Sequence, residues 1–294
     1  MRGNESEVDE MAIRKVGIFG LGTMGHGIAI VAATAGHDVL VMEADDDLLS
    51  AGLDRIHTYL DRQVGKGRME ESERENALRR LRGSSLMAEF KDRDIVIEAI
   101  FENMELKCEL LAKLNDACMP ETIFATNTSS LSVTEMASRS GRPDRFVGLH
   151  FFNPVPVMKL VEVIRALQTS DGVYEAAFAF AESLGKKPVR TPDSPGFIVN
   201  RLLVPYLNDA ARVFEQGLAS AEDIDNAMKL GCGYPMGPLA LIDLIGLDVA
   251  VWVGEILFKE FGEARMAPPP ILRRMVRAGY LGKKSGKGFY DYGG

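Results

Sequence analysis

Val16-Gly17-Ile18-Phe19-Gly20-Leu21-Gly22-Thr23-Met24-Gly25 is the stretch that decides the fold of this chain. Its first four residues form an apolar run typical of a buried strand, and the small apolar residues of 24–35 favour a helix. Three glycines between them have the spacing Gly-x-Gly-x-x-Gly. In a strand–turn–helix unit the first glycine permits the tight turn, the second lets a pyrophosphate approach the backbone, and the third lets the helix pack against the strand. The stretch therefore predicts an α/β unit that binds a dinucleotide.

An acidic residue follows at the distance such a unit requires. Glu43 ends the next apolar run, residues 37–42, and lies 23 residues after Gly20. A carboxylate here can accept hydrogen bonds from the ribose hydroxyls of NAD and repels the 2′-phosphate of NADP. NAD is therefore the expected cofactor, and FAD is the lesser alternative. The other interpretation is that the glycines form an ordinary turn and that Glu43 is a solvated strand end, with no ligand bound. The cofactor contacts expected in this region are Gly20, Leu21, Gly22, Thr23, Met24, Gly25 and Glu43.

Strands and helices alternate through the first two thirds of the chain. Apolar runs at 94–100 and 122–126 predict further strands. Helical patterns occupy 46–82, with a break near residues 65–67, and 102–118. Such alternation, which we expect to continue to residue 187, is typical of a parallel sheet with helices on both faces.

A capping box predicts where one loop of this sheet ends. Ser132 and Glu135 have the Ser-x-x-Glu spacing, so a helix should begin there. Ser129, just before it, is then expected on a strand-to-helix loop.

The pattern changes after residues 188–196, which are rich in proline and polar residues. Only helical patterns follow, at 197–215, 221–230, 238–261 and 270–278. The fold class we expect is α/β: a Rossmann-like, doubly wound, mainly parallel sheet domain at 14–192, followed by an all-α domain at 193–294. Residues 1–13 are acidic and contain no apolar run, so they predict a mobile extension and resemble neither a signal nor a transit peptide.

Composition excludes several kinds of partner. With 294 residues the chain is long enough for two domains. Its net charge of −8 and its lack of a long basic tract argue against nucleic acid or an anionic membrane surface. The three cysteines are odd in number and lack metal-ligand spacing, so we expect a reducing compartment, no disulfide framework and no metal. The longest apolar segment, 239–258, contains three acidic residues, which is too much charge for a membrane span. A cytoplasmic protein is expected.

The stretch 148–163 contains a candidate for proton transfer. His150 and Glu162 lie there among apolar residues and prolines. An imidazole titrates near neutral pH, and a carboxylate within reach of one ring nitrogen would fix the tautomer and stabilise the cation. A core histidine with a satisfied hydrogen bond and a solvated glutamate are the alternative interpretation.

Three segments together resemble the monofunctional 3-hydroxyacyl-CoA dehydrogenase family, which includes bacterial 3-hydroxybutyryl-CoA dehydrogenases. The segments are Asn127-Thr128-Ser129-Ser130-Leu131, His150-Phe151-Phe152-Asn153-Pro154 with Glu162, and Pro195-Gly196-Phe197-Ile198-Val199-Asn200-Arg201. The resemblance extends from about residue 15 to residue 292 and includes 98–103 and 282–290. It implies a reversible, NAD-dependent oxidation of (S)-3-hydroxyacyl-CoA to 3-ketoacyl-CoA, in the direction of β-oxidation or of butyrate synthesis.

The resemblance also implies the role of each site residue. His150 is the general base that takes the proton of the 3-hydroxyl group while C3 gives a hydride to the nicotinamide, and Glu162 orients and balances the imidazole. Ser129 and Asn200, which alone would be interpreted as helix caps or buried polar groups, hydrogen-bond around the substrate oxygen and the nicotinamide. Further cofactor contacts implied are Glu102, Lys107, Ser129, Asn153 and Lys284, and the substrate contacts are Ser129, Lys66 and Asn200.

Two alternatives remain open. One is a related NAD-dependent dehydrogenase that acts on a free sugar acid or hydroxy acid, such as L-gulonate. The other is a non-catalytic dinucleotide-binding protein, since a fold does not fix a function. Lys66 distinguishes an acyl-CoA enzyme from the first alternative, because the resemblance places it at the coenzyme A tail. Tyr59 departs from the family pattern, since some members have a small hydroxyl residue there. The four residues Ser129, His150, Glu162 and Asn200 together argue against the second.

The helical part is expected to pair with a second copy. Apolar stripes in 197–214 and 239–258 exceed what a small core requires, so they predict a homodimer through these helices, as the resemblance also implies.

Overall fold

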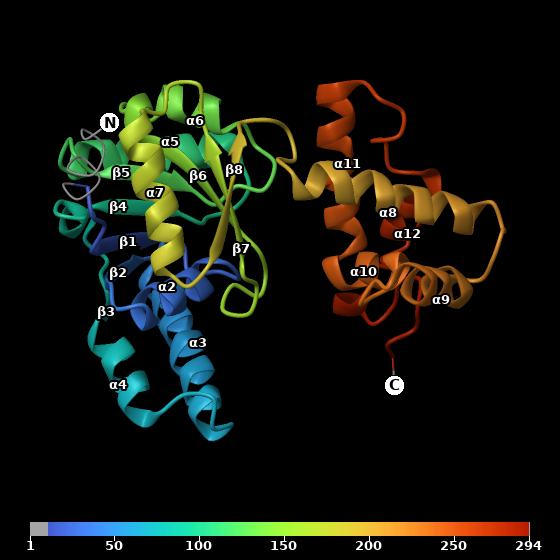
Figure 1. Ribbon diagram of the computed structural model, residues 1–294, viewed down its shortest axis with the longest axis horizontal. Coiled ribbons are helices and arrows are strands. Elements are labelled where there is room, and N and C mark those ends of the chain that lie inside the picture. Colours follow the sequence, from blue (N-terminus) through green and yellow to red (C-terminus); the bar gives the residue numbers. More distant parts are fainter. Residues whose placement is uncertain (1–10, 294) are drawn as a thin grey trace, which may run out of the picture. The chain divides into compact units, whose positions relative to one another are not determined.

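The computed structural model describes residues 11–293 and divides into two compact units, Met1–Ser194 and Pro195–Gly294 (Figure 1). This division falls two residues after the limit of 192 expected from the sequence. Each unit is described by itself. No helix within the described range is both long and apolar enough to cross a membrane.

The first unit is built on one eight-stranded sheet with the order β3-β2-β1-β4-β5-β6-β7-β8. Its strands are β1 (Lys15–Phe19), β2 (Asp38–Met42), β3 (Leu81–Gly83), β4 (Ile95–Glu98), β5 (Ile123–Thr126), β6 (Phe146–Phe151), β7 (Leu160–Arg165) and β8 (Lys187–Pro192). The first six strands are parallel, whereas β7 is antiparallel to β6 and parallel to β8. The strand order reverses at β1 and β4. Open α/β sheets bind ligands at the carboxyl ends of such strands.

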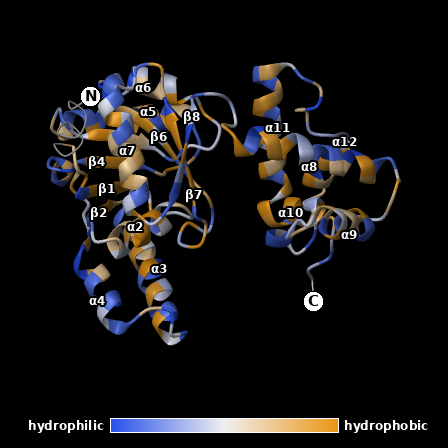
Figure 2. Ribbon diagram, in the orientation of Figure 1, coloured by the Kyte–Doolittle hydropathy of each residue, from blue (hydrophilic) through white to orange (hydrophobic). Residues whose placement is uncertain are grey.

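Helices cover both faces of this sheet. They are α2 (Gly25–Thr34), α3 (Asp46–Gly65), α4 (Glu71–Arg79), α5 (Met104–Ala117), α6 (Val133–Arg139) and α7 (Asp171–Ser183), with short 3₁₀ helices η1 (Met87–Phe90) and η2 (Pro143–Arg145). Alternate strand residues such as Val16 and Ile18 share one core with α2 and α7. Val96 and Phe124 belong to the opposite pleat, and Figure 1 shows α5 on that side and α7 on the other. The central strands β1 and β4 are mainly apolar, while α4 is mainly polar (Figure 2). The expected doubly wound domain is confirmed.

Two elements of the first unit differ from the expectation. The alternation of parallel strands and helices was expected to continue to residue 187, but β7 returns antiparallel to β6 after the connection 152–159. This connection is shorter than the dozen or more residues that a parallel crossover needs, and it contains two prolines. The helical pattern expected over 46–82 was also wrong at its end, because β3 pairs there with β2 as the edge strand.

The mobile N-terminal extension expected over residues 1–13 is too long. Residues 1–10 of it lie outside the described residues, but Met11 and Ile13 are partly buried against the core of the first unit. Burial of apolar side chains against a core stabilises their position, so the prediction of a mobile segment was wrong at residues 11–13.

The helix start expected at Ser132 is confirmed. The Ser132 hydroxyl accepts a hydrogen bond from the Glu135 backbone N–H at 3.2 Å, and α6 begins at Val133. The Glu135 carboxylate pairs with Arg139 one turn later at 3.4 Å. Ser129 therefore lies on the loop between β5 and α6, as predicted.

The second unit is helical, as expected. It contains α8 (Val199–Glu215), α9 (Ala221–Cys232), α10 (Pro238–Ile245), α11 (Leu247–Phe261), α12 (Pro270–Arg277) and the 3₁₀ helix η3 (Lys283–Ser285). The single helix expected over 238–261 was wrong. Gly246, with φ of 103°, breaks it into α10 and α11, because a helix cannot continue through that backbone conformation.

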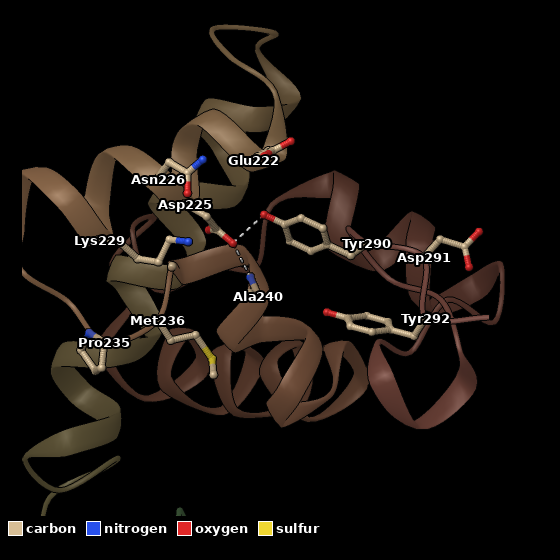
Figure 3. Close-up of a pocket in the computed structure, with 11 residues that line it drawn as sticks. Glu222, Asp225, Asn226, Lys229, Pro235, Met236, Ala240, Tyr290, Asp291 and Tyr292 are labelled. Atoms are coloured by element: carbon tan, nitrogen blue, oxygen red, sulfur yellow. Dashed lines mark hydrogen bonds between the residues drawn. The ribbon is translucent and has the colours of Figure 1, made fainter. Parts of the chain in front are cut away.

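Two buried carboxylates hold the C-terminal segment of this unit. Asp225 accepts hydrogen bonds from the Leu239 and Ala240 backbone N–H groups at 2.8 and 2.9 Å and from the Tyr290 hydroxyl at 2.8 Å, beside the open pocket drawn in Figure 3. Asp243 accepts from the backbone N–H groups of Phe289 and Tyr290, both at 2.9 Å. Burial raises the pKa of Tyr290 and of Asp243. The run 282–290 thus has a structural role, which is to close the chain against α9 and α10.

Candidate active site at the carboxyl edge of the sheet

The glycine loop between β1 and α2 contains two glycines that the fold itself requires. Gly20 has φ of 96°, and its backbone N–H donates to the Met42 carbonyl at 2.9 Å. A Cβ on Gly20 would lie 2.7 Å from the Ala99 carbonyl oxygen, and one on Gly25 would lie 1.7 Å from the Gly20 carbonyl oxygen. Any side chain at either position would therefore displace backbone.

Gly22 differs, because no atom beyond its own residue and its two chain neighbours lies within 4 Å of where its Cβ would be. Packing within the protein therefore does not require glycine there. The first turn of α2 carries no acidic residue. An open backbone at a helix N-terminus is where the pyrophosphate of a dinucleotide binds in this type of loop. The loop thus fits NAD.

Two side chains hold the backbone of this loop. The half-buried Glu43 follows β2, and its carboxylate accepts from the Leu21 backbone N–H and from the Ala44 N–H, the latter at 3.1 Å. Arg55 of α3 donates to the Leu21 carbonyl at 2.9 Å. Glu43 thus lies at the loop in this structure, and its contact with a ribose stays a prediction.

His150 and Glu162 form a buried pair. The distance from Nδ1 of His150 to Oε2 of Glu162 is 2.6 Å, and the two residues are 6% and 0% exposed. Because the carboxylate is the acceptor, Nδ1 carries the proton, so Nε2 is the nitrogen that can exchange a proton with a substrate.

The register of the sheet brings these two side chains together. His150 of β6 lies directly opposite Glu162 of β7 in the antiparallel pair. Side chains of directly opposed residues lie on the same face, about 5 Å apart at Cβ. The Phe152 ring packs against the imidazole, with ring centroids 4.5 Å apart. The distance that the sequence left open is thus fixed by strand pairing.

Two residues that sequence reasoning did not select support this strand pair. Asn127 accepts a hydrogen bond from the Phe151 backbone N–H at 3.0 Å, which ties β6 to the end of β5. The buried Lys186 donates to the Met158 carbonyl at 2.9 Å and to the Val155 carbonyl, so it holds the connection between β6 and β7. Burial lowers the pKa of Lys186. Asn127 lies inside a quoted motif, but nothing in the local sequence distinguishes Lys186 from a surface lysine.

Ser129 is held on the neighbouring loop by Glu102. One Glu102 carboxylate oxygen accepts from the Ser129 backbone N–H at 2.7 Å, from its hydroxyl at 3.2 Å and from the Thr128 hydroxyl at 2.6 Å. Glu102 lies just before α5, so the loop after β4 and the loop after β5 are joined at this carboxylate.

Lys107 lies inside the protein beneath this contact. It is 1% exposed, forms a salt bridge with the fully buried Glu98 and lies 3.2 Å from the Glu102 carboxylate. Glu98 also accepts from the Thr126 hydroxyl at 2.8 Å and from the Ile100 backbone N–H at 2.9 Å. Burial raises the pKa of the Glu98 carboxyl, and Lys107 opposes that shift. Sequence reasoning missed Glu98, although a carboxylate that ends an apolar strand is a visible signal.

The other expected site residues are placed as follows. Lys66 and Asn153 are exposed in the first unit. In the second unit, Asn200 is the second residue of α8, and the Lys284 ammonium lies 2.6 Å from the Asp248 carboxylate. Their contacts with cofactor or substrate stay predictions.

Comparison with known proteins identifies the family. The model of "3-hydroxyacyl-CoA dehydrogenase, NAD binding domain" matches residues 15–194, and that of "3-hydroxyacyl-CoA dehydrogenase, C-terminal domain" matches residues 196–292. A probable 3-hydroxybutyryl-CoA dehydrogenase of Bacillus subtilis is 47% identical over 282 residues, which cover 96% of this chain and 98% of the relative. The human mitochondrial hydroxyacyl-coenzyme A dehydrogenase is 45% identical over 291 residues, with 96% and 92% covered.

A solved structure agrees with both matches. The crystal structure of (S)-3-hydroxybutyryl-CoA dehydrogenase from Ralstonia eutropha superposes with a TM-score of 0.94 and 47% identity, and the match covers 96% of this chain and 100% of the other. The chain therefore belongs to the 3-hydroxyacyl-CoA dehydrogenase family of NAD-dependent oxidoreductases.

Proposed function

We propose that this protein oxidises short-chain (S)-3-hydroxyacyl-CoA, such as 3-hydroxybutyryl-CoA, to 3-ketoacyl-CoA with NAD, reversibly. The observation that carries the proposal is the buried hydrogen bond between His150 and Glu162 near the carboxyl end of β6. The names of the relatives support the acyl-CoA substrate.

His150 is the proton acceptor in the proposed reaction. In oxidation, Nε2 takes the proton of the 3-hydroxyl group as the C3–H bond breaks and the carbonyl forms. NAD, when bound, supplies the acceptor for the hydride. Glu162 keeps the proton on Nδ1 and stabilises the imidazolium that forms. In reduction the imidazolium returns its proton to the oxygen, so oxidation needs neutral His150 and reduction needs the protonated form.

The remaining site residues complete this proposal. Ser129 and Asn200 hydrogen-bond to the substrate oxygen or the nicotinamide. Glu43 binds the adenosine ribose beside the glycine loop. Glu102, Asn153 and Lys284 are proposed as further cofactor contacts. Lys107, which was expected among them, is buried against Glu98 and Glu102, so any influence on the cofactor would pass through Glu102.

Lys66 is proposed to bind a phosphate of coenzyme A. It is exposed at the C-terminal end of α3, next to the exposed Arg68, so cations are available there for an anionic tail.

A cytoplasmic location is also proposed. Free cysteines, such as Cys108, Cys118 and Cys232, are typical of proteins in a reducing compartment, which supports this location.

We expect the protein to be a homodimer that pairs through its helical unit. Several large apolar side chains of this unit are exposed, among them Leu202 of α8 and Leu230 of α9 at 71% and 85%. Exposed apolar side chains gathered on one unit are typical of an interface between subunits.

A comparison of substrates tests the proposed function. With acetoacetyl-CoA and NADH we expect rapid loss of the NADH absorbance, and with L-gulonate and NAD we expect none. Lys66→Ala should raise KM for acetoacetyl-CoA about tenfold and leave KM for NADH unchanged, which is a loss of about 1.4 kcal/mol for one phosphate contact. Lys113→Ala, which removes an exposed lysine of α5, is the matched control.

Turnover of L-gulonate without turnover of any acyl-CoA would contradict the proposal and favour the sugar-acid alternative. Binding of NADH without turnover of either substrate would favour a non-catalytic protein.

A further inference from the structure

We propose that Glu98 is a positioning residue, which sets the Ser129 hydroxyl through Lys107 and Glu102. The inference rests on the role proposed for Ser129. It concerns a fully buried carboxylate that the proposed reaction does not itself use.

The first contacts in this series fix the Glu98 carboxylate. Glu98 is the last residue of β4, and its two carboxylate oxygens have separate partners. Oε1 accepts from the Ile100 backbone N–H and from the Lys107 ammonium, and Oε2 accepts from the Thr126 hydroxyl of β5. A carboxylate that accepts hydrogen bonds from the neighbouring strand and from a backbone N–H has one orientation, so it fixes the position of the ammonium bound to it.

The second step transmits that position to the loop. The Lys107 ammonium also donates to the Ile100 carbonyl at 3.3 Å and lies 3.2 Å from Oε2 of Glu102. The other Glu102 oxygen accepts from the Ser129 backbone N–H and hydroxyl. Lys107 is therefore shared by a buried carboxylate and by the carboxylate that contacts Ser129.

Charge explains why the buried carboxylate is needed. Lys107 is almost fully buried, and a buried ammonium with too few partners is unstable. Glu98 provides the buried counter-charge, so the ammonium can stay between the two carboxylates. Without that counter-charge, Lys107 would shift toward Glu102, and the Ser129 hydroxyl would lose its fixed place.

A double-mutant cycle tests the inference. Glu98→Gln keeps the shape of the side chain and removes its charge. We expect kcat at saturating NADH to fall about 10- to 100-fold, because small misplacements of a reacting group have effects of this order. In a Ser129→Ala background the same substitution should change kcat less than about twofold, because the hydroxyl that it displaces is absent.

A second measurement does not depend on turnover. The Ser129 amide donates to Glu102 at 2.7 Å, so its hydrogen exchange should be at least about tenfold faster in Glu98→Gln. Thr122→Val removes a buried hydrogen bond to the Arg93 carbonyl at the other end of β5 and is the control. It should leave Ser129 exchange unchanged.

Equal losses of kcat in the wild-type and Ser129→Ala backgrounds, with unchanged Ser129 exchange, would overturn the inference. If the wild-type protein shows no turnover, the proposed function fails. The exchange measurement then decides the positioning role alone: faster Ser129 exchange in Glu98→Gln supports it, and unchanged exchange overturns it.

Discussion

The glycines of the loop after β1 serve two different purposes. Gly20 and Gly25 are required by the backbone, since a Cβ on either would meet carbonyl atoms within 2.7 Å. Gly22 has open space around it. A requirement for glycine at that position therefore comes from what binds there and not from folding.

Gly22→Ala tests this distinction. We expect NADH affinity to fall at least about tenfold, because the methyl group would occupy the space of the pyrophosphate. The free energy of unfolding should stay within about 0.5 kcal/mol of wild type, since the methyl group meets no protein atom. Fluorescence titration with NADH and urea unfolding measure the two quantities.

Gly65→Ala is the matched control, because a Cβ there also meets no atom but lies at the end of α3. It should bind NADH as the wild type does. Wild-type affinity in Gly22→Ala would contradict the placement of the pyrophosphate at this loop.

Some residues of the candidate site could be predicted from the sequence and others could not. The glycine loop and Glu43 are local, because a strand, a turn and a helix of fixed length determine their positions. The position of Lys186 depends on contacts with distant residues: a lysine in a loop is usually solvated, and only the fold buries this one. The sequence therefore showed which residue types were present but not which of them were buried.

At the scale of elements, the pair β6 and β7 brings the two candidate catalytic side chains together. The sequence predicted strands and helices in alternation, and this pattern fails where the connection 152–159 replaces a helix. An antiparallel return places His150 opposite Glu162, whereas a parallel crossover would not pair these two positions. The distance of 2.6 Å is thus a property of strand register, which periodicity alone does not determine. The break between α10 and α11 at Gly246 was likewise hidden by a continuous apolar pattern.

His37, which lies just before β2, should make the free energy of unfolding depend on pH. His37 is buried between α2 and β2, and its Nε2 lies 3.0 Å from the Ser183 hydroxyl of α7. Burial lowers the pKa of His37 below its usual 6.5. The unfolded chain therefore binds a proton at a higher pH than the folded chain does. The stability contributed by neutral His37 is present above about pH 6.5 and is lost as the pH falls through the folded-state pKa.

Urea unfolding at pH 7.5 and pH 5.5 measures this effect. We expect the wild-type free energy of unfolding to be lower at pH 5.5, and His37→Gln should reduce the difference between the two values. His57→Gln, which removes an exposed histidine of α3, should keep the wild-type difference. An unchanged difference in His37→Gln would show that His37 is not the group responsible.

At the scale of the whole molecule, the division into a sheet unit and a helical unit was visible in the sequence, because the hydrophobic pattern changes after β8. The apolar stripes of 197–214 and 239–258 predicted a homodimer, and the structure adds which of their side chains are exposed.

Light scattering at micromolar concentration tests the homodimer, for which we expect twice the chain mass of 32.2 kDa. Leu202→Glu, Leu230→Glu and Val249→Glu each place a charge on an exposed apolar position of the helical unit, and at least one of them should give a monomer. Leu167→Glu changes a leucine of the first unit that is 89% exposed and should remain dimeric. A monomeric wild-type protein would contradict the proposal.

The central claim is that His150, held by Glu162, moves the proton while the bound cofactor exchanges the hydride. The most direct measurement is the rate of NADH oxidation by acetoacetyl-CoA in His150→Gln, with NADH affinity measured on the same sample. We expect the rate to fall by about 10³-fold or more, the order of loss expected for a proton-transfer group, while NADH affinity stays within about twofold of wild type. A His150→Gln variant that keeps a rate near that of the wild type would contradict the claim.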